Sequence, residues 1–346
     1  MSRIITDCSL KLQSTQQLAE YITKVAISVN GQVAAASAGG EVLVDSQLLL
    51  EDCEQSIDAL EFSSDGNFLA AAGQSGKIYI WQIKATIAPE LIETIDLKNN
   101  WLEHLQWNGN LLAFSWQGYT QVREFPSKKI ITTLEHKDSN ILAMAWRPPL
   151  FKELSLLADK IIKIYDSDNW DDEPITLYIE AVPVGLAWSN DGRYLAVNRL
   201  DKSVSLFEWG NTEPWLLHGF LGKVRQITFS ASREPILAMA TINQIVTWKR
   251  SKKAGEGWLA TMLEAKEQDN IEALAFAPNS EILASVSESG ILALWFKGRL
   301  IGQVQADAGF GLSCLAWLSN SKAIVTGGQD GSLNIWKVIQ SGKGFA

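Results

Sequence analysis

A short pattern recurs eight times along the chain, at intervals of 35 to 47 residues, and it constrains the fold more than any other feature. In each copy an apolar segment runs into a turn, as in ALEFSSDG (59–66) and GLAWSNDG (185–192). Each copy has one large apolar residue at the same position: Ile27, Phe62, Trp107, Trp146, Trp188, Phe229, Phe276 and Trp317. Because the repeats occupy nearly the whole chain, we predict a single domain over residues 1–346.

Each copy predicts four antiparallel strands. The residue before the large one is often alanine, as at 145 and 187, which is typical of a strand buried on both faces. A second apolar run and a tight turn follow, and then a third strand such as KIYIW (77–81) or SLNIW (332–336). A more polar fourth strand comes next, as in LIETIDL (91–97). Four strands in a period of about 42 residues indicate a propeller blade.

The sequence resembles the WD-repeat β-propeller family over essentially its whole length. The resemblance rests on the period, on the SSDG and SNDG turns and on the aromatic residues that end the third strands. The Trp-Asp pair itself is missing, since Gln82 follows Trp81 and Lys337 follows Trp336, so the repeats are divergent. The expected fold is all-β, a single propeller of four-stranded antiparallel blades.

The number of blades and the closure of the ring follow from the two ends of the chain. Eight copies favour eight blades, but the first (21–53) has no tryptophan and carries Asp45 at the aromatic position. If that copy pairs irregularly, seven blades result. Only KVIQSGKGFA follows Trp336, too little for a good fourth strand. We therefore predict that SLKLQS (9–14) pairs into the last blade and closes the ring.

In the WD-repeat family a histidine, a Ser or Thr, an Asp and the third-strand aromatic form a hydrogen-bonded structural network. The resemblance implies such a network in the fourth copy, made of His136, Ser155, Asp159 and Tyr165. Related hairpin and packing roles are expected for Asp201, Asp330 and Trp336. A serine, a histidine and an aspartate also make up a hydrolase triad, but no GxSxG elbow accompanies them, so we predict a structural role.

Charge and composition exclude several classes of function for this chain. The net charge of −9 argues against broad nucleic-acid binding and against docking on anionic lipid. The sequence contains no run of about 18 apolar residues, so no membrane span is expected. The three cysteines are far apart, and CxxC and HExxH are absent, so neither a metal site nor a cofactor is expected. His104 is expected to be packed or to face the channel. The sparse cysteines favour a cytoplasmic protein.

Two surfaces are candidates for partner binding. The resemblance implies that partners bind the rim carrying the loops before each first strand. Its exposed aromatic and charged candidates are Trp101, Trp215, Phe310, Asp58, Glu103, Arg225 and Glu272. Alternatively, Trp101 and Trp215 only cover blade edges.

The second surface is the acidic run DSDNWDDEP (166–174) on the opposite rim. It is either a solvated loop or a contact for a basic partner, made by Asp168, Trp170, Asp171 and Asp172 with the tryptophan as apolar anchor. A basic stretch, KRSKKAGEGW (249–258), occupies the same loop two blades on.

These observations favour a non-catalytic scaffold that docks or assembles partner proteins or peptides on the propeller rims. One alternative is a hydrolase or metal-dependent enzyme with its site at the mouth of the central channel. Another is a structural subunit of an obligate complex. The scaffold is preferred because the repeats use the whole chain and no catalytic motif accompanies them.

Overall fold

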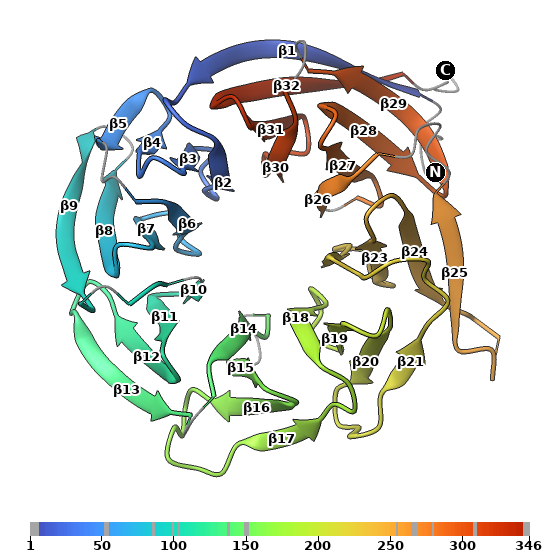
Figure 1. Cartoon of the computed structure of the whole chain (residues 1–346), viewed down its shortest axis with the longest axis horizontal. Helices are drawn as coiled ribbons and strands as arrows, with labels where there is room; N and C mark the ends of the chain where they lie inside the picture. Colours follow the sequence, from blue (N-terminus) through green and yellow to red (C-terminus); the bar gives the residue numbers. More distant parts are fainter. Residues whose placement is uncertain are drawn as a thin grey trace.

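The computed structural model describes residues 7–51, 55–84, 87–98, 100–102, 104–136, 139–148, 152–253, 255–263, 269–278, 280–306 and 310–341. In this part of the chain 32 strands form eight four-stranded antiparallel sheets, arranged as a ring (Figure 1). The fold is an eight-bladed β-propeller. The prediction of eight blades is confirmed, and the alternative of seven is wrong.

The strands of the first four blades follow the chain from the innermost to the outermost. Blade 1 comprises β2 (Ile22–Ile27), β3 (Val33–Ser37), β4 (Val42–Val44) and β5 (Gln47–Leu50). Blade 2 comprises β6 (Ile57–Phe62), β7 (Phe68–Gly73), β8 (Lys77–Lys84) and β9 (Ile87–Asp96). Blade 3 comprises β10 (His104–Asn108), β11 (Leu111–Trp116), β12 (Tyr119–Glu124) and β13 (Lys129–Glu135). Blade 4 comprises β14 (Ile141–Trp146), β15 (Glu153–Ala158), β16 (Ile161–Asp166) and β17 (Ile175–Tyr178).

The other half of the ring repeats this order, except in its last blade. Blade 5 comprises β18 (Pro183–Trp188), β19 (Tyr194–Arg199), β20 (Val204–Glu208) and β21 (Trp215–Leu217). Blade 6 comprises β22 (Gln226–Phe229), β23 (Ile236–Ala240), β24 (Ile245–Arg250) and β25 (Trp258–Leu263). Blade 7 comprises β26 (Ile271–Phe276), β27 (Leu283–Ser287), β28 (Ile291–Phe296) and β29 (Arg299–Gln305). Blade 8 comprises β30 (Leu312–Trp317), β31 (Ala323–Gly328), β32 (Ser332–Ser341) and, as its outermost strand, β1 (Asp7–Gln17).

The ring closes through β1. This strand pairs antiparallel with β32, from Asp7 opposite Ser341 to Gln17 opposite Ser332, so the two ends of the chain share one sheet (Figure 1). Leu10 packs against the core between blades 7 and 8. The predicted closure by the N-terminal strand is confirmed. It removes the exposed edge that β32 otherwise presents to other chains.

The first blade is complete although it lacks an aromatic residue in its third strand. Asp45 lies at the turn that follows β4, with a positive φ of 52°. Its carboxylate accepts the backbone N–H of Val33 at 3.0 Å. The acid therefore holds the turn to the neighbouring strand, which explains why the weakest copy still forms a regular blade.

The core lies between neighbouring blades, where small residues of one sheet meet large residues of the next. Between blades 1 and 2, Ala34 and Ala36 pack in one cluster with Phe62 and Trp81. Two buried third-strand indole N–H groups find partners within their own blade: Trp295 donates to Ser285 and Trp336 to Thr326, each at 2.9 Å. The packing and polar pairing together fix each blade against its neighbour.

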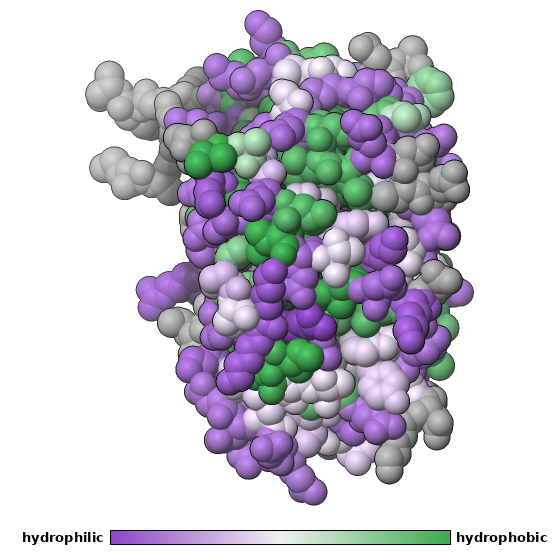
Figure 2. Space-filling model, turned by 90° about the vertical axis from the view of Figure 1, so that its left-hand side faces the viewer, coloured by the Kyte–Doolittle hydropathy of each residue, from purple (hydrophilic) through white to green (hydrophobic). Residues whose placement is uncertain are grey.

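The propeller has two rims and a side wall. We call the rim with the blade-to-blade loops and the second-to-third-strand hairpins the upper rim, and the opposite one the lower rim. The outermost strands form the side wall, and β5, β9 and β13 face the viewer in Figure 2. Exposed apolar residues such as Ile87, Leu91 and Ile130 lie on these strands, and Figure 2 shows apolar groups interrupted by hydrophilic ones.

Candidate functional site

The most developed site on the upper rim is a pocket beside Trp101, in the loop between blades 2 and 3. The indole is 54% exposed. Its Nε1–H donates to Asp58 Oδ2 at 2.7 Å, and Ser56 donates to the other carboxylate oxygen at 2.5 Å. The next residue, Leu102, is fully buried, and its N–H donates to the carbonyl of Gly73 at 3.1 Å. Trp101 is therefore held in one orientation while most of its ring faces solvent.

The pocket lies between this tryptophan and the second-to-third-strand hairpin of blade 3. Its volume is about 680 Å³ including the open mouth. The lining residues come from four segments of the upper rim: Asn100, Trp101, His104, Ser115, Trp116, Gln117, Asn140 and Ile141. The Trp116 ring stacks on Phe114 and on Tyr119, with centroids 5.6 and 5.7 Å apart. The site thus combines flat aromatic surfaces with several amide groups, as peptide-binding sites do.

His104 lines the pocket and carries a buried polar atom. Burial lowers the pKa of its imidazole, a hydrogen bond with the backbone of Ile141 opposes this, and the charge of Lys24 lowers it further. The ring is therefore neutral at pH 7. Its Nε2 is buried without a hydrogen-bond partner in the described part of the chain.

Glu61 lies between the inner strands of blades 2 and 3, where several other blades carry alanine. The side chain accepts the backbone N–H of Trp107 at 3.1 Å. Burial raises the pKa of this carboxyl group to about 8, although the hydrogen bond from Trp107 opposes the shift. The group is therefore mainly protonated at neutral pH.

The other predicted upper-rim residues do not gather around Trp101. Phe310 is exposed between blades 7 and 8, with its backbone against Gly290. Arg225 is exposed before β22, and Glu272 is half-buried in β26. These three lie on blades 6 to 8, across the ring from Trp101 (Figure 1). Glu103 lies outside the described residues.

The predicted place of Trp215 is wrong. It begins β21 on the side wall instead of lying in an upper-rim loop, and its ring lies against Gly257 in the lower-rim loop of blade 6. Pro214 immediately precedes the strand, a position that proline tolerates because the first residue need not donate to the ladder. A three-residue strand has no alternation that sequence could show.

The acidic run has the predicted lower-rim location, but Trp170 is not an exposed anchor. Its ring packs edge-on against Trp146, with centroids 6.1 Å apart, and is half-buried against the core of blade 4. Asp168 pairs with Lys152 at 2.9 Å. Asp171 and Asp172 remain exposed.

The basic stretch is largely engaged with acids of its own surroundings. Its ion pairs run from Lys249 to Glu234 and Glu281, from Arg250 to Glu208, from Lys252 to Glu234, and from Lys253 to Glu256. These pairs lower the effective positive charge of this loop.

The network predicted in the fourth copy does not form as one hydrogen-bonded set. His136 is hydrogen-bonded to Thr120 of blade 3 at 3.2 Å and meets Tyr165 through a ring contact, at 6.4 Å between centroids. Ser155 instead accepts the indole N–H of Trp188 from blade 5, at 2.9 Å. Ser155 is thus paired across the boundary between blades 4 and 5, and His136 contacts Tyr165 across the boundary between blades 3 and 4.

The hairpin acids and the last third-strand aromatic lie as follows. Asp159 occupies the hairpin between β15 and β16 with a φ of 52°. Asp201 accepts hydrogen bonds from Ser203 and Arg199. Asp330 accepts the N–H of Ser332 at 3.0 Å. Trp336 is buried between blades 7 and 8.

The described residues hold no helix long and apolar enough to cross a membrane. They also hold no group of three or more His, Cys, Asp or Glu side chains placed to bind a metal ion.

The fold is an eight-bladed propeller with a pocket on its upper rim, and comparison with known proteins identifies three of its repeats. The model of the WD domain, G-beta repeat, matches residues 46–82, 258–295 and 298–337. Each match begins at or near the outer strand of one blade and ends with the third strand of the next. Three of the repeats are therefore WD repeats, and they lie in a chain that folds over its described length as an eight-bladed β-propeller.

Relatives and solved structures agree with this family. The chain is 22% identical to rat (Rattus norvegicus) telomerase protein component 1 over 299 residues, covering 80% of the chain and 11% of the relative. It is 20% identical to the Arabidopsis thaliana WD repeat-containing protein 26 homolog, covering 83% and 49%. The chain thus spans about half or less of these relatives.

Among solved structures, Sqt1 from Chaetomium thermophilum superposes with a TM-score of 0.78 at 16% identity, covering 97% of this chain and 98% of that one. A second structure of Sqt1, bound to the N-terminus of the ribosomal protein L10, gives a TM-score of 0.77 at 16% identity and covers 96% and 100%. The C-terminal WD40 domain of Sif2 gives 0.76 at 13%, covering 95% and 98%.

Proposed function

We propose that the protein is a non-catalytic scaffold and that a segment of a partner protein docks on the upper rim over the Trp101 pocket. The WD-repeat propeller is typical of protein-interaction scaffolds, and the Sqt1 structure with a ribosomal-protein N-terminus shows that a similar propeller binds a peptide. The observation that carries the proposal is the indole of Trp101, which is exposed yet fixed by its hydrogen bond to Asp58. Fixed aromatic rings lose little entropy on binding and are common hot spots.

The described acids near this pocket support binding over catalysis. Asp58 is occupied by Trp101 and Ser56, and Glu61 by the backbone of Trp107. An acid–base site instead presents free groups to a substrate. The net charge of −9 supports protein partners over nucleic acid.

We also propose that the protein is cytoplasmic, since Cys8 and Cys314 are buried free thiols. Recovery of the tagged chain in a secreted or membrane fraction contradicts this proposal.

Replacing Trp101 with alanine is expected to lower the affinity for the captured partner at least about tenfold, because removal of a central aromatic anchor typically costs about 2 kcal/mol or more of binding free energy. The measurement is affinity capture with mass spectrometry, followed by titration of the recovered partner. Leu259→Ala is the control, because Leu259 is similarly exposed but lies on the side wall. Trp101→Phe keeps a ring but removes the hydrogen bond to Asp58. Its affinity for the partner is expected to lie between those of the wild-type protein and Trp101→Ala. If Trp101→Ala retains every partner at unchanged affinity, the upper-rim pocket is not the docking site.

A further inference from the structure

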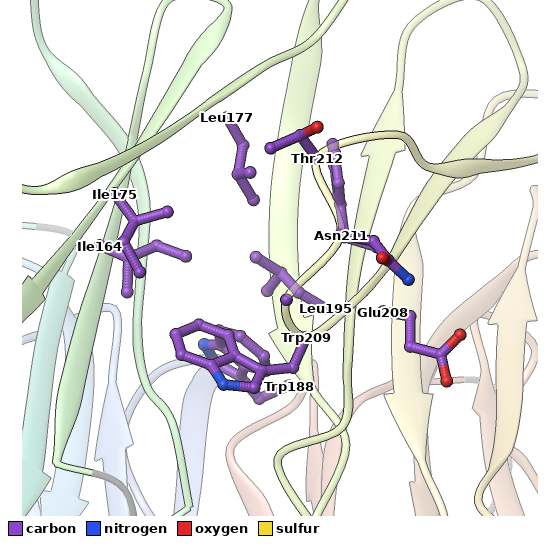
Figure 3. A pocket seen from close by; sticks show the side chains of 11 residues that line it. Ile164, Ile175, Leu177, Trp188, Leu195, Glu208, Trp209, Asn211 and Thr212 are labelled. Atoms are coloured by element: carbon purple, nitrogen blue, oxygen red, sulfur yellow. The ribbon is translucent and has the colours of Figure 1, made fainter.

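A second pocket lies on the lower rim, between blades 4 and 5, and no sequence pattern pointed to it. Its space is about 430 Å³, part of it open to solvent. Ile164, Ile175 and Leu177 of blade 4 form one wall, Trp188 and Trp209 form the base, and the 208–212 segment forms the other wall (Figure 3). The pocket is lined mainly by apolar side chains and is open on one side, so an apolar side chain can enter it from solvent.

The base of this pocket is fixed before any ligand arrives. Trp188 is held by its hydrogen bond to Ser155. The guanidinium of Arg147 lies 3.7 Å from the ring centroid of Trp209. Arg147 is itself fixed, because it donates to the carbonyl of Gly192 at 2.8 Å and forms a buried ion pair with Glu153 at 3.0 Å. A preformed apolar pocket needs little reorganisation to bind a side chain.

The pocket is open because the outermost strand of blade 5 is short. Strand β21 pairs only with Val204–Leu206 of β20, so Phe207 and Glu208 extend beyond it. The chain then leaves the sheet through Gly210, whose φ is 87°, and returns at Pro214. Ile175, at the start of β17, is 50% exposed on the opposite side of the opening.

The surroundings of the opening carry unpaired negative charge. The exposed acids Asp171, Asp172 and Glu173 lead directly into Ile175, and none of them forms an ion pair within the described ranges. Glu180 and Glu213 line an adjoining hollow that shares Leu177 and Thr212 with the pocket.

Three nearby cations are already engaged. Lys152 pairs with Asp168, Arg199 with Asp201 and Arg250 with Glu208. The pocket thus sits in a rim of excess negative charge.

We propose that this blade 4–5 pocket binds a segment of a partner protein in which one large apolar side chain stands among lysines or arginines. The apolar side chain fills the space over Trp209, and the cations face Asp171, Asp172 and Glu213. Burial of the side chain supplies affinity, while the charges supply selectivity and faster association. Since this pocket and the Trp101 pocket lie on opposite rims, the propeller holds two partners at once.

The test uses labelled twelve-residue peptides of lysine and serine with a central leucine or phenylalanine, titrated by fluorescence anisotropy. One control peptide has glycine at the centre, and another has glutamate in place of lysine. The apolar basic peptides are expected to bind. The glycine peptide is expected to have an affinity at least about tenfold lower. The glutamate peptide is expected not to bind.

Variants of the chain locate the binding. Ile175→Ala trims a half-exposed wall, and Thr212→Trp fills the entrance; each is expected to weaken the leucine peptide at least about fivefold. Asp171→Asn/Asp172→Asn is expected to weaken it about three- to tenfold and to reduce its salt dependence. Glu90→Gln/Glu135→Gln changes the net charge equally on exposed side-wall positions and is expected to leave affinity within twofold. Trp101→Ala is expected to have no effect.

Three results overturn the proposal. One is that no basic apolar peptide binds the wild-type protein. Another is that the glycine peptide binds as tightly as the leucine peptide, because attraction is then purely electrostatic. The third is that Trp101→Ala weakens binding while Ile175→Ala and Thr212→Trp do not, which places the peptide on the upper rim. This last result leaves the proposed upper-rim function standing, so the two proposals fail separately.

Discussion

Deletion of residues 1–17 is expected to open the ring and to destabilise the protein by at least about 5 kcal/mol. The deletion removes β1 and its ten-residue register with β32, where each net backbone hydrogen bond contributes about 1 kcal/mol. It also removes Cys8, whose backbone lies against Gly302 of blade 7, and Leu10 from the core between blades 7 and 8. The measurement is urea unfolding followed by tryptophan fluorescence. The exposed edge of β32 is expected to promote aggregation as well.

Two leucines on the same strand provide a matched control. Leu10 packs against the core, whereas Leu12 is 41% exposed. Leu10→Ser is therefore expected to cost about 2 kcal/mol and Leu12→Ser less than about 0.5 kcal/mol. A peptide of residues 7–17 added to the deleted protein is expected to restore part of the stability. An unchanged unfolding midpoint after deletion contradicts closure of the ring by β1.

Repetition made the architecture predictable from sequence. The eight large apolar positions, from Ile27 to Trp317, lie in or at the end of the innermost strands, and the third-strand segments such as 332–336 coincide with observed strands. One ambiguous copy matters little when seven others share its register. The N-terminal strand was predictable because blade 8 otherwise lacks an outer strand and unpaired edges are costly.

The sites were predictable only where one residue carried the signal. Trp101 and Asp58 were both candidates, but their mutual hydrogen bond depends on how blades 2 and 3 pack. Trp170 stands among acids in the sequence, yet its ring packs against Trp146 and is therefore half-buried instead of exposed on the rim. Strand alternation shows which face a side chain points to and not which neighbour it meets across a blade boundary.

The blade 4–5 pocket illustrates the same limit. Trp188 and Trp209 come from one blade and Ile164 and Leu177 from another, so no local pattern contains the pocket. Its opening depends on the early end of β21, and a three-residue strand leaves no periodic trace. The single usable sequence signal was the acidic run, which marks the charge beside the pocket without revealing the pocket.

Glu61→Gln is expected to stabilise the protein increasingly as pH rises from 5 to 8. Burial holds the pKa of Glu61 at about 8 in the folded state, whereas an unfolded glutamate has a pKa of about 4.3. Between these values the folded state keeps a proton that the unfolded state has lost. Stability therefore falls with rising pH, by up to about 1.4 kcal/mol per unit. Glutamine is neutral and keeps an oxygen for the N–H of Trp107, so the variant escapes this loss.

The two proteins are compared by urea unfolding at pH 5, 6, 7 and 8, and the variant is expected to be more stable by about 2 kcal/mol or more at pH 8. Subtracting the two curves cancels the other titrating groups, including His104, because both proteins share them. Glu61→Ala separates charge from hydrogen bonding: it also removes the charge but leaves the N–H of Trp107 without its acceptor, at a cost of about 1–3 kcal/mol. Glu90→Gln, on the exposed side wall, is expected to show no pH-dependent difference. By its exposed surface Glu61 is only partly buried, so a difference between Glu61→Gln and wild type that stays flat from pH 5 to 8 means that solvent keeps Glu61 ionised in the folded protein.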